Sequence, residues 1–144
     1  MSTNTRSRRE RGAAAVEMAI VLPLLLLIMG GVVEFGRALF IQNMATNAAR
    51  EGARMRALGY TTVQATERVN SAMIGMGVTT FTVTYDGVAG AGAGTVTPNA
   101  NCPTTPLITD RQRVTVNPNF AFIFPIPGVT PPTLSSQSEM RCGG

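Results

Sequence analysis

The stretch that decides the fold of this chain is residues 13–33, which read AAAVEMAIVLPLLLLIMGGVV. These residues are apolar except for Glu17, and they suffice to cross a hydrocarbon core as a helix, which takes about 20 residues. No second stretch compares with it. After Tyr60 the chain is rich in Thr, Gly, Pro and Asn, and its longest apolar run is Phe120 to Phe124. The sequence therefore predicts a single-pass membrane protein.

Basic residues flank the apolar stretch on both sides. They are Arg6, Arg8, Arg9 and Arg11 before it and Arg37, Arg50, Arg54 and Arg56 after it. The formal net charge of +4 would suit nucleic acid, but this grouping fits anchoring at a membrane edge, so no nucleic-acid partner is expected. Because the two groups are equal in number, charge alone sets the orientation only weakly.

The two cysteines, Cys102 and Cys142, both follow the apolar stretch, as expected for a part that folds in an oxidising compartment. We therefore expect a cytoplasmic N-terminus and an extracytoplasmic C-terminal part. A bond between them would close a loop of about 40 residues, worth roughly 4 kcal/mol in the chain-entropy model. Two unpaired thiols are the alternative, because Cys142 lies near a terminus that can fray.

Helical periodicity continues beyond the apolar stretch. No proline occurs from Glu34 to Leu58, and one helix face carries Ile41, Met44, Ala45, Ala48, Gly52 and Met55. A helix from Ala13 to Leu58 would be about 69 Å long, so its second half would protrude from the membrane.

Small residues follow one side of this protruding half. We call Ala45, Ala48, Ala49, Gly52 and Ala53 the small-residue stripe. Such a stripe allows close packing of a helix from another subunit. The soluble part of the same chain could equally fold back against it, and both interpretations are open at this point.

The remaining residues, 59–144, predict one small domain of α+β class with an antiparallel sheet. Thr61 or Thr62 can cap a helix from Val63 to Ile74 that Gly75 and Gly77 end. Strands are expected at 78–85, 111–116, 120–124 and 133–140, with Phe81, Val83 and Tyr85 on one face of the first. A Gly/Ala loop at 87–94 and Pro-rich turns at 102–106 and 125–132 should connect them.

Catalysis is not expected. The chain has no histidine, and its acids after Arg68 are Asp86, Asp110 and Glu139, at spacings that suggest neither shared acid–base work nor a metal site. The Gly-rich loop lacks the Gly-Lys-Ser/Thr ending of a phosphate cradle. We therefore expect no cofactor, no metal and no small-molecule substrate.

Four motifs in order carry a family resemblance. They are RGAAAVE at 11–17, LPLL at 22–25, EFGR at 34–37 and AAREGAR at 48–54. Over residues 8–54 the chain resembles the TadE-like family of bacterial tight-adherence (Flp, type IVb-like) pilus assembly proteins. The resemblance implies a pseudopilin or minor pilin of the inner membrane that helps to build pili for surface adhesion. The partners it implies are prepilin peptidase, other pilin-like subunits and the pilus assembly machinery.

The resemblance also implies a processing site. Prepilin peptidase would cut between Gly12 and Ala13, which makes Glu17 the fifth mature residue. The expected organisation is a prepilin-like leader at 1–12, a transmembrane and protruding helix at 13–58, and an extracytoplasmic domain at 59–144. Met18 departs from the major pilins of this class, which carry an aromatic residue after the glutamate.

Two other classes compete with this interpretation. One is a membrane-anchored extracytoplasmic binding or sensor module, which the composition neither shows nor excludes. The other is a secreted protein with a cleaved signal peptide, which would need a small-residue cut site near Gly30 to Val33, where no Ala-x-Ala motif occurs.

Overall fold

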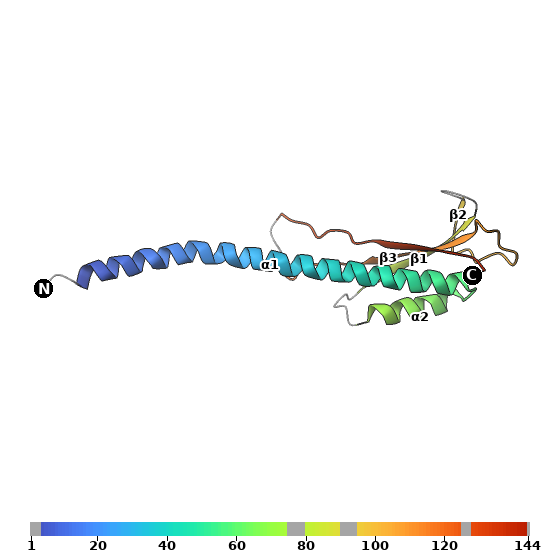
Figure 1. Cartoon of the computed structure of the whole chain (residues 1–144), viewed down its shortest axis with the longest axis horizontal. Coiled ribbons are helices and arrows are strands. Elements are labelled where there is room, and N and C mark those ends of the chain that lie inside the picture. The colour runs from blue at the N-terminus through green and yellow to red at the C-terminus, as the bar shows by residue number, and fades with distance from the viewer. Residues whose placement is uncertain (1–3, 75–79, 90–94, 125–127, 144) are drawn as a thin grey trace. The chain divides into compact units, whose positions relative to one another are not determined.

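A computed structural model describes residues 4–74, 80–89, 95–124 and 128–143. Helices α1 (Asn4–Ala57) and α2 (Thr62–Met73) precede strands β1 (Phe81–Ala89), β2 (Thr95–Pro98), β3 (Arg111–Pro118) and β4 (Ser136–Arg141) (Figure 1). This order confirms the α+β class with a long N-terminal apolar helix. Residue contacts divide the chain into two compact units, one up to Gly36 and one from Arg37 on.

The first unit consists of the first half of α1. Helix α1 begins at Asn4 rather than at Ala13 and continues through Pro23. Its part from Gly12 to Ala57 is the one helix among the described residues that is long and apolar enough to cross a membrane. The apolar side chains between Val16 and Val33 are about half exposed or more, because nothing within the unit covers them.

The second unit is built on a four-stranded sheet of order β2-β1-β3-β4, in which all neighbours are antiparallel. Strand β1 pairs with β3 from Phe81 opposite Pro118 to Val88 opposite Arg111. The sheet is therefore antiparallel, as predicted. The alternation expected in β1 is also observed, since Phe81, Val83 and Tyr85 all join the core while Thr82 and Thr84 are exposed.

The core of the second unit lies where the second half of α1 and all of α2 meet the sheet. Its buried members are Ala45, Ala48, Ala49 and Ala53 from α1, Ala65, Val69 and Met73 from α2, and Tyr85, Val114 and Val116 from the sheet. The α2 residues recur every four positions, which places them on one helix face. Alanines on the long helix allow the larger side chains of the sheet to approach its backbone.

Helix α2 is capped by Thr61, one of the two residues predicted to cap it. The Thr61 side chain accepts a hydrogen bond from the Gln64 backbone amide, and the Gln64 side chain accepts one from the Thr61 amide, which makes a capping box. The helix spans Thr62–Met73, one residue earlier at each end than expected. Gly75 and Gly77, the expected terminators, lie outside the described residues.

The predicted strand at Phe120–Phe124 is wrong. The Phe120 ring is buried, with the Arg37 guanidinium 4.4 Å from its centre, and the Ala121 carbonyl accepts a hydrogen bond from Arg37 Nη2. The segment therefore packs on α1 instead of joining the sheet. A short apolar run does not distinguish these outcomes, because neither has a sequence period of its own over five residues.

The predicted loop at 87–94 is wrong in its first part. Gly87 and the two residues after it belong to β1 and pair with β2, a strand that the sequence pattern does not predict. Gly87 suits this position because a Cβ there would stand 2.9 Å from the Ala100 Cβ. The glycine thus marks a close backbone approach rather than a flexible connector. Residues 90–94 lie outside the described ranges.

Candidate functional site

The predicted processing residues occupy the exposed surface of α1 in the first unit. Gly12, Ala13 and Glu17 are all exposed, and apart from the adjacent residues and the nearby helix backbone no atom lies within 4 Å of the position that a Cβ on Gly12 would take. Ala13 and Glu17 are four residues apart, so they share one helix face. The peptide bond between Gly12 and Ala13 lies within the helix.

The small-residue stripe is buried within the chain's own second unit. Ala45, Ala48, Ala49 and Ala53 have no exposed surface. A Cβ on Gly52 would stand 2.8 Å from Val69 Cγ2 on α2 and 3.2 Å from Val114 Cγ1 on β3. Of the two interpretations left open by the sequence, the structure shows the folding back of the domain. The stripe leaves no surface for a helix from a neighbouring subunit.

This packing predicts a large effect of volume at Gly52. Replacing Gly52 with valine should lower the free energy of unfolding by about 1–3 kcal/mol, because the added methyl groups overpack the junction of α1, α2 and β3. Chemical denaturation of the full chain in detergent measures the change. The matched control is Gly36→Val, also in α1, where a Cβ meets nothing within 4 Å and the change should stay within about 0.5 kcal/mol. Equal losses in both variants would contradict this explanation, because valine is a better helix former than glycine and only Gly52 packs against α2 and β3.

Arg56 is a buried arginine in the last turn of α1. From the sequence it was expected to lie at the membrane edge. Arg56 is 2% exposed and donates hydrogen bonds to the carbonyls of Tyr60 and Ala100 and to Asn101 Oδ1, at 2.8–2.9 Å. No carboxylate of the described residues lies within ion-pair distance. Burial lowers the pKa of Arg56, and the neighbouring Tyr85 partly offsets this. A four-residue spacing from Gly52 on the buried face was the one signal in the sequence that pointed to its burial.

Tyr85 is the second buried polar group of this region. Its hydroxyl is 2.9 Å from the Thr66 hydroxyl, and its ring centre is 5.8 Å from the Arg56 guanidinium carbon. Burial raises the pKa of Tyr85 above its ordinary value of 10.0, against the opposing effects of the Thr66 hydrogen bond and the Arg56 charge. Because the folded chain holds this proton more tightly than the unfolded chain, the resulting stability is complete below pH 10.0 and is lost as the pH rises through the folded pKa.

Alkaline pH should therefore destabilise the second unit through Tyr85. We expect the unfolding free energy of the wild type to fall as the pH rises above the ordinary tyrosine pKa of 10.0 and through the raised pKa of Tyr85. The Tyr85→Phe variant should start about 1 kcal/mol lower, having lost one hydrogen bond, and should show a shallower fall. Denaturant titrations at several pH values, with tyrosinate absorbance as a second readout, measure both. Parallel pH profiles for the two proteins would contradict the role assigned to Tyr85.

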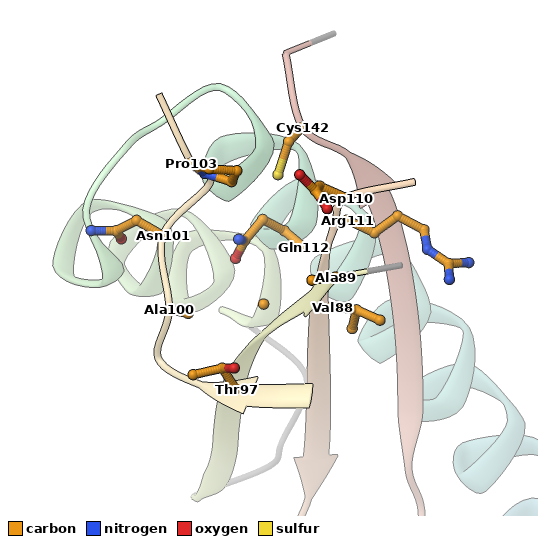
Figure 2. Close-up of a pocket in the computed structure, with 11 residues that line it drawn as sticks. Val88, Ala89, Thr97, Ala100, Asn101, Pro103, Asp110, Arg111, Gln112 and Cys142 are labelled. Carbon is orange, nitrogen blue, oxygen red and sulfur yellow. The ribbon is translucent and has the colours of Figure 1, made fainter. Parts of the chain in front are cut away.

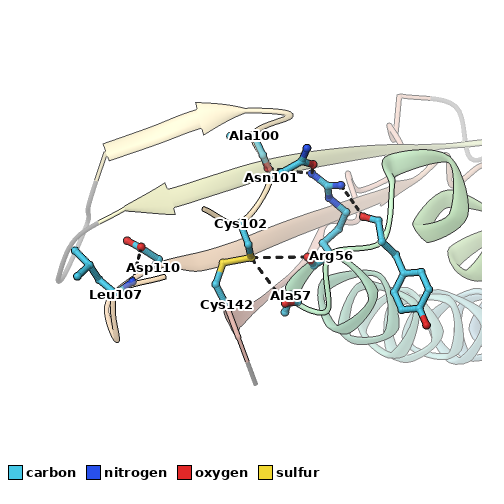
Figure 3. The surroundings of a disulfide bond; sticks show 9 residues. Arg56, Ala57, Ala100, Asn101, Cys102, Leu107, Asp110 and Cys142 are labelled. Atoms are coloured by element: carbon cyan, nitrogen blue, oxygen red, sulfur yellow. Dashed lines mark hydrogen bonds between the residues drawn. A yellow bond between two sulfur atoms is a disulfide. The ribbon is translucent and has the colours of Figure 1, made fainter. Parts of the chain in front are cut away.

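The two cysteines are joined in the structure. The Cys102–Cys142 bond spans 5.6 Å between Cα atoms, and Cys102 Sγ lies 3.8 Å and 3.9 Å from the carbonyl oxygens of Arg56 and Ala57 (Figure 3). The Cys142 amide donates to the Asp110 carbonyl at 2.9 Å. The bond thus ties the residue after β4 to the segment before β3, directly against the C-terminal end of α1.

A small cavity lies beside this disulfide, among side chains of β1, β3 and the segment at Ala100 to Pro103 (Figure 2). Its volume of about 220 Å³ is below the 300–1,000 Å³ that is usual for ligand pockets. Gln112, 1% exposed, lines it with an Oε1 atom that has no hydrogen-bond partner. A second hollow of about 450 Å³ lies between Phe120 and the Pro131–Ser135 segment.

Two acids of the second unit, Glu139 and Asp110, make structural contacts. Glu139 on β4 contacts Arg113 at 2.6 Å and Arg111 at 3.3 Å on β3. The Asp110 carboxylate accepts the Leu107 amide at 2.8 Å. Among the described residues, no three His, Cys, Asp or Glu side chains come together as metal ligands would.

Comparison with known protein families finds a match to the family described as TadE-like protein, over residues 12–54. The match covers less than a third of the chain, and it confirms the resemblance that the four motifs carry. It supports a role connected with tight-adherence pili. No curated protein and no solved structure matches the chain.

Proposed function

We propose that this chain, TadE-like over residues 12–54, is a non-enzymatic pilin-like membrane protein, a pseudopilin or minor pilin, that takes part in assembling tight-adherence pili for surface attachment. The family match carries this proposal. It begins at Gly12, includes the whole apolar segment, and ends in the half of α1 that packs on the sheet. One element thus joins a membrane anchor to a folded domain, which is the construction that a pilin-like subunit needs.

Processing by prepilin peptidase is part of the proposal. The peptidase would cut between Gly12 and Ala13 and release the basic leader of residues 1–12. Exposure of both residues supports this assignment. Glycine also suits it chemically, because glycine lowers the cost of unwinding a helix and adds no side chain in the path of the enzyme.

Glu17 would then drive subunit assembly. An unpaired carboxylate in lipid costs of order 2–3 kcal/mol near the membrane centre and less near the interface. The amine created at Ala13 lies one helical turn away on the same face, so it can pair with Glu17 of its own chain or of a neighbouring subunit. In the alternative, the carboxylate reaches the headgroups without a partner.

The disulfide supports the proposed orientation. Structural disulfides persist in oxidising compartments, so the unit from Arg37 on would lie outside the cytoplasm and the leader inside, in the inner membrane of a bacterium. The peptidase, other pilin-like subunits and the assembly machinery are the proposed partners.

Cell fractionation with N-terminal sequencing tests the proposal. An inner-membrane protein that begins at Ala13 is expected. An N-terminus near Glu34 would identify a secreted protein, and one at Met1 or Ser2 a plain membrane anchor. A deletion strain should lose tight-adherence pili and regain them with the wild-type gene. Gold labelling of the second unit on sheared pili would then separate a fibre subunit from an assembly factor.

A further inference from the structure

The segment between β3 and β4 has an unusual composition for a surface connection. Residues 119–135 read NFAFIFPIPGVTPPTLS and contain no charged residue. Within the described parts of this segment, Ile123, Phe124 and Val129 are 57%, 58% and 50% exposed. Exposed aromatic and branched apolar side chains that gather in one segment indicate a surface with an apolar partner.

Both limbs of this segment, which we call the β3–β4 connection, are fixed to α1. On the first limb, Arg37 donates to the Ala121 carbonyl and stacks on the Phe120 ring. On the second limb, the Ser135 carbonyl accepts a hydrogen bond from Gln42 Nε2 at 2.8 Å. Figure 1 shows this connection running along α1 away from the strands. The apolar side chains are therefore held at a defined level of the helix, near Arg37.

That level corresponds to the edge of the bilayer. Arg37 follows Val33, the last residue of the apolar stretch, by one helical turn, or about 6 Å of helix rise. The headgroup layer on each side of the hydrocarbon core is about 5–7 Å thick. A residue one turn beyond the span lies within this layer, and the backbone that Arg37 binds lies beside it. On α1 itself, Leu39 and Phe40 are also about half exposed at this level.

We propose that the β3–β4 connection inserts its apolar side chains, Ile123, Phe124 and Val129, into the lipid interface around the membrane helix. Aromatic and aliphatic side chains enter the boundary between headgroups and acyl chains, and an adjacent arginine keeps its charge among the lipid phosphates. The second unit is thereby attached to the membrane at a second point besides its helix. The proposal rests on the membrane-spanning part of the proposed function and on nothing else in it.

Exposed apolar side chains also occur elsewhere in the second unit, so exposure alone does not identify the β3–β4 connection as the part that enters the membrane. Leu107 and Ile108 are 67% and 79% exposed, but they lie beside Asp110, whose carbonyl binds Cys142 at the other end of the second unit. Twenty residues of α1 separate that end from Arg37, or about 30 Å of helix. Leu107 and Ile108 therefore provide a control with similar exposure, which we expect to lie in water rather than at the membrane.

The absence of tryptophan from the chain allows a direct test. Single tryptophans are placed at Phe124, at Leu107 and, within the membrane helix, at Leu26 of the full-length protein. Each variant is reconstituted into phosphatidylcholine vesicles with and without bromine on the acyl chains. We expect bromolipid to quench Phe124→Trp and Leu26→Trp several-fold more than Leu107→Trp. Val129→Trp reports from the second limb if Phe124→Trp fails to fold.

Each other outcome overturns the proposal in a recognisable way. If Phe124→Trp and Val129→Trp resist bromolipid but are quenched by iodide, the connection is in water. If both quenchers fail, another protein copy covers it. If Leu26→Trp also resists bromolipid, the membrane helix itself is wrong, and the proposed function falls together with this inference.

Discussion

Replacing Gly12 with isoleucine is expected to leave the chain at full length in the membrane, whereas the wild type should lose residues 1–12. Helix α1 runs from Asn4 through Gly12, so the peptide bond must leave the helix before a protease can hold it extended. Glycine disfavours the helix by about 1 kcal/mol relative to good helix formers, and it exposes its peptide on all sides. Isoleucine removes both advantages, so loss of processing should be essentially complete.

The measurement is the intact mass of the protein purified from membranes, with N-terminal sequencing. Gly31→Ile is the matched control, because Gly31 lies in the same helix and a Cβ added there would also meet no atom within 4 Å. This variant should be processed like the wild type. A wild-type protein that retains residues 1–12 would end the peptidase hypothesis, and equal processing of Gly12→Ile would show that the enzyme ignores this side chain.

A second consequence concerns assembly. If processing releases an amine that pairs with Glu17, then Gly12→Ile should also reduce incorporation of the chain into pili or assembly complexes, even though its second unit remains folded. Glu17→Gln should share the assembly defect while its mass still shows the loss of residues 1–12. This combination would separate recognition of the cut site from pairing after the cut.

The sequence predicted well those elements whose periodicity or capping is local. The apolar run at 13–33, the cap of α2 at Thr61 and the alternation of Phe81, Val83 and Tyr85 all depend on neighbours within one turn or one strand. Strand β2 was missed because its four residues are all exposed and carry no burial pattern. A strand of this kind exists through pairing with β1, and pairing is not visible in composition.

Long-range contacts explain the remaining failures. Arg56 looked like a membrane anchor because arginines near an apolar helix usually are, but its acceptors, Ala100 and Asn101, are more than 40 residues away in sequence. Phe120 looked like a strand residue, but its ring packs under Arg37 of α1. The small-residue stripe allowed two partners, and only the folded domain decides between them. For each of these groups the sequence shows the residue type, but the contacts depend on the tertiary fold.

Removing the disulfide by the double substitution Cys102→Ala and Cys142→Ala is expected to lower the free energy of unfolding of the second unit by roughly 4 kcal/mol. The bond closes a loop of about 40 residues, and the chain entropy that this closure removes from the unfolded state accounts for the value. Contacts near the bond in the folded state add to the loss. The bond holds the segment that carries Ala100 and Asn101, which accept hydrogen bonds from Arg56. If this segment moves when the bond is absent, the buried guanidinium of Arg56 loses two of its three acceptor residues. Removing the bond should therefore also weaken the folded state, in addition to its effect on the entropy of the unfolded chain.

Alanine is the better replacement because Cys142 is buried, where a serine hydroxyl would need a partner. Denaturant titration of the full chain in detergent, followed by near-ultraviolet circular dichroism, measures the loss. The reduced wild type serves as the control and should unfold at a similar denaturant concentration. If the oxidised wild type and the double variant unfold together, the bond does not stabilise the second unit. If the unreduced, denatured wild type titrates two thiols, the bond does not form in the cell. The argument for an extracytoplasmic second unit would then lose its chemical support, because that orientation depends on an oxidising compartment.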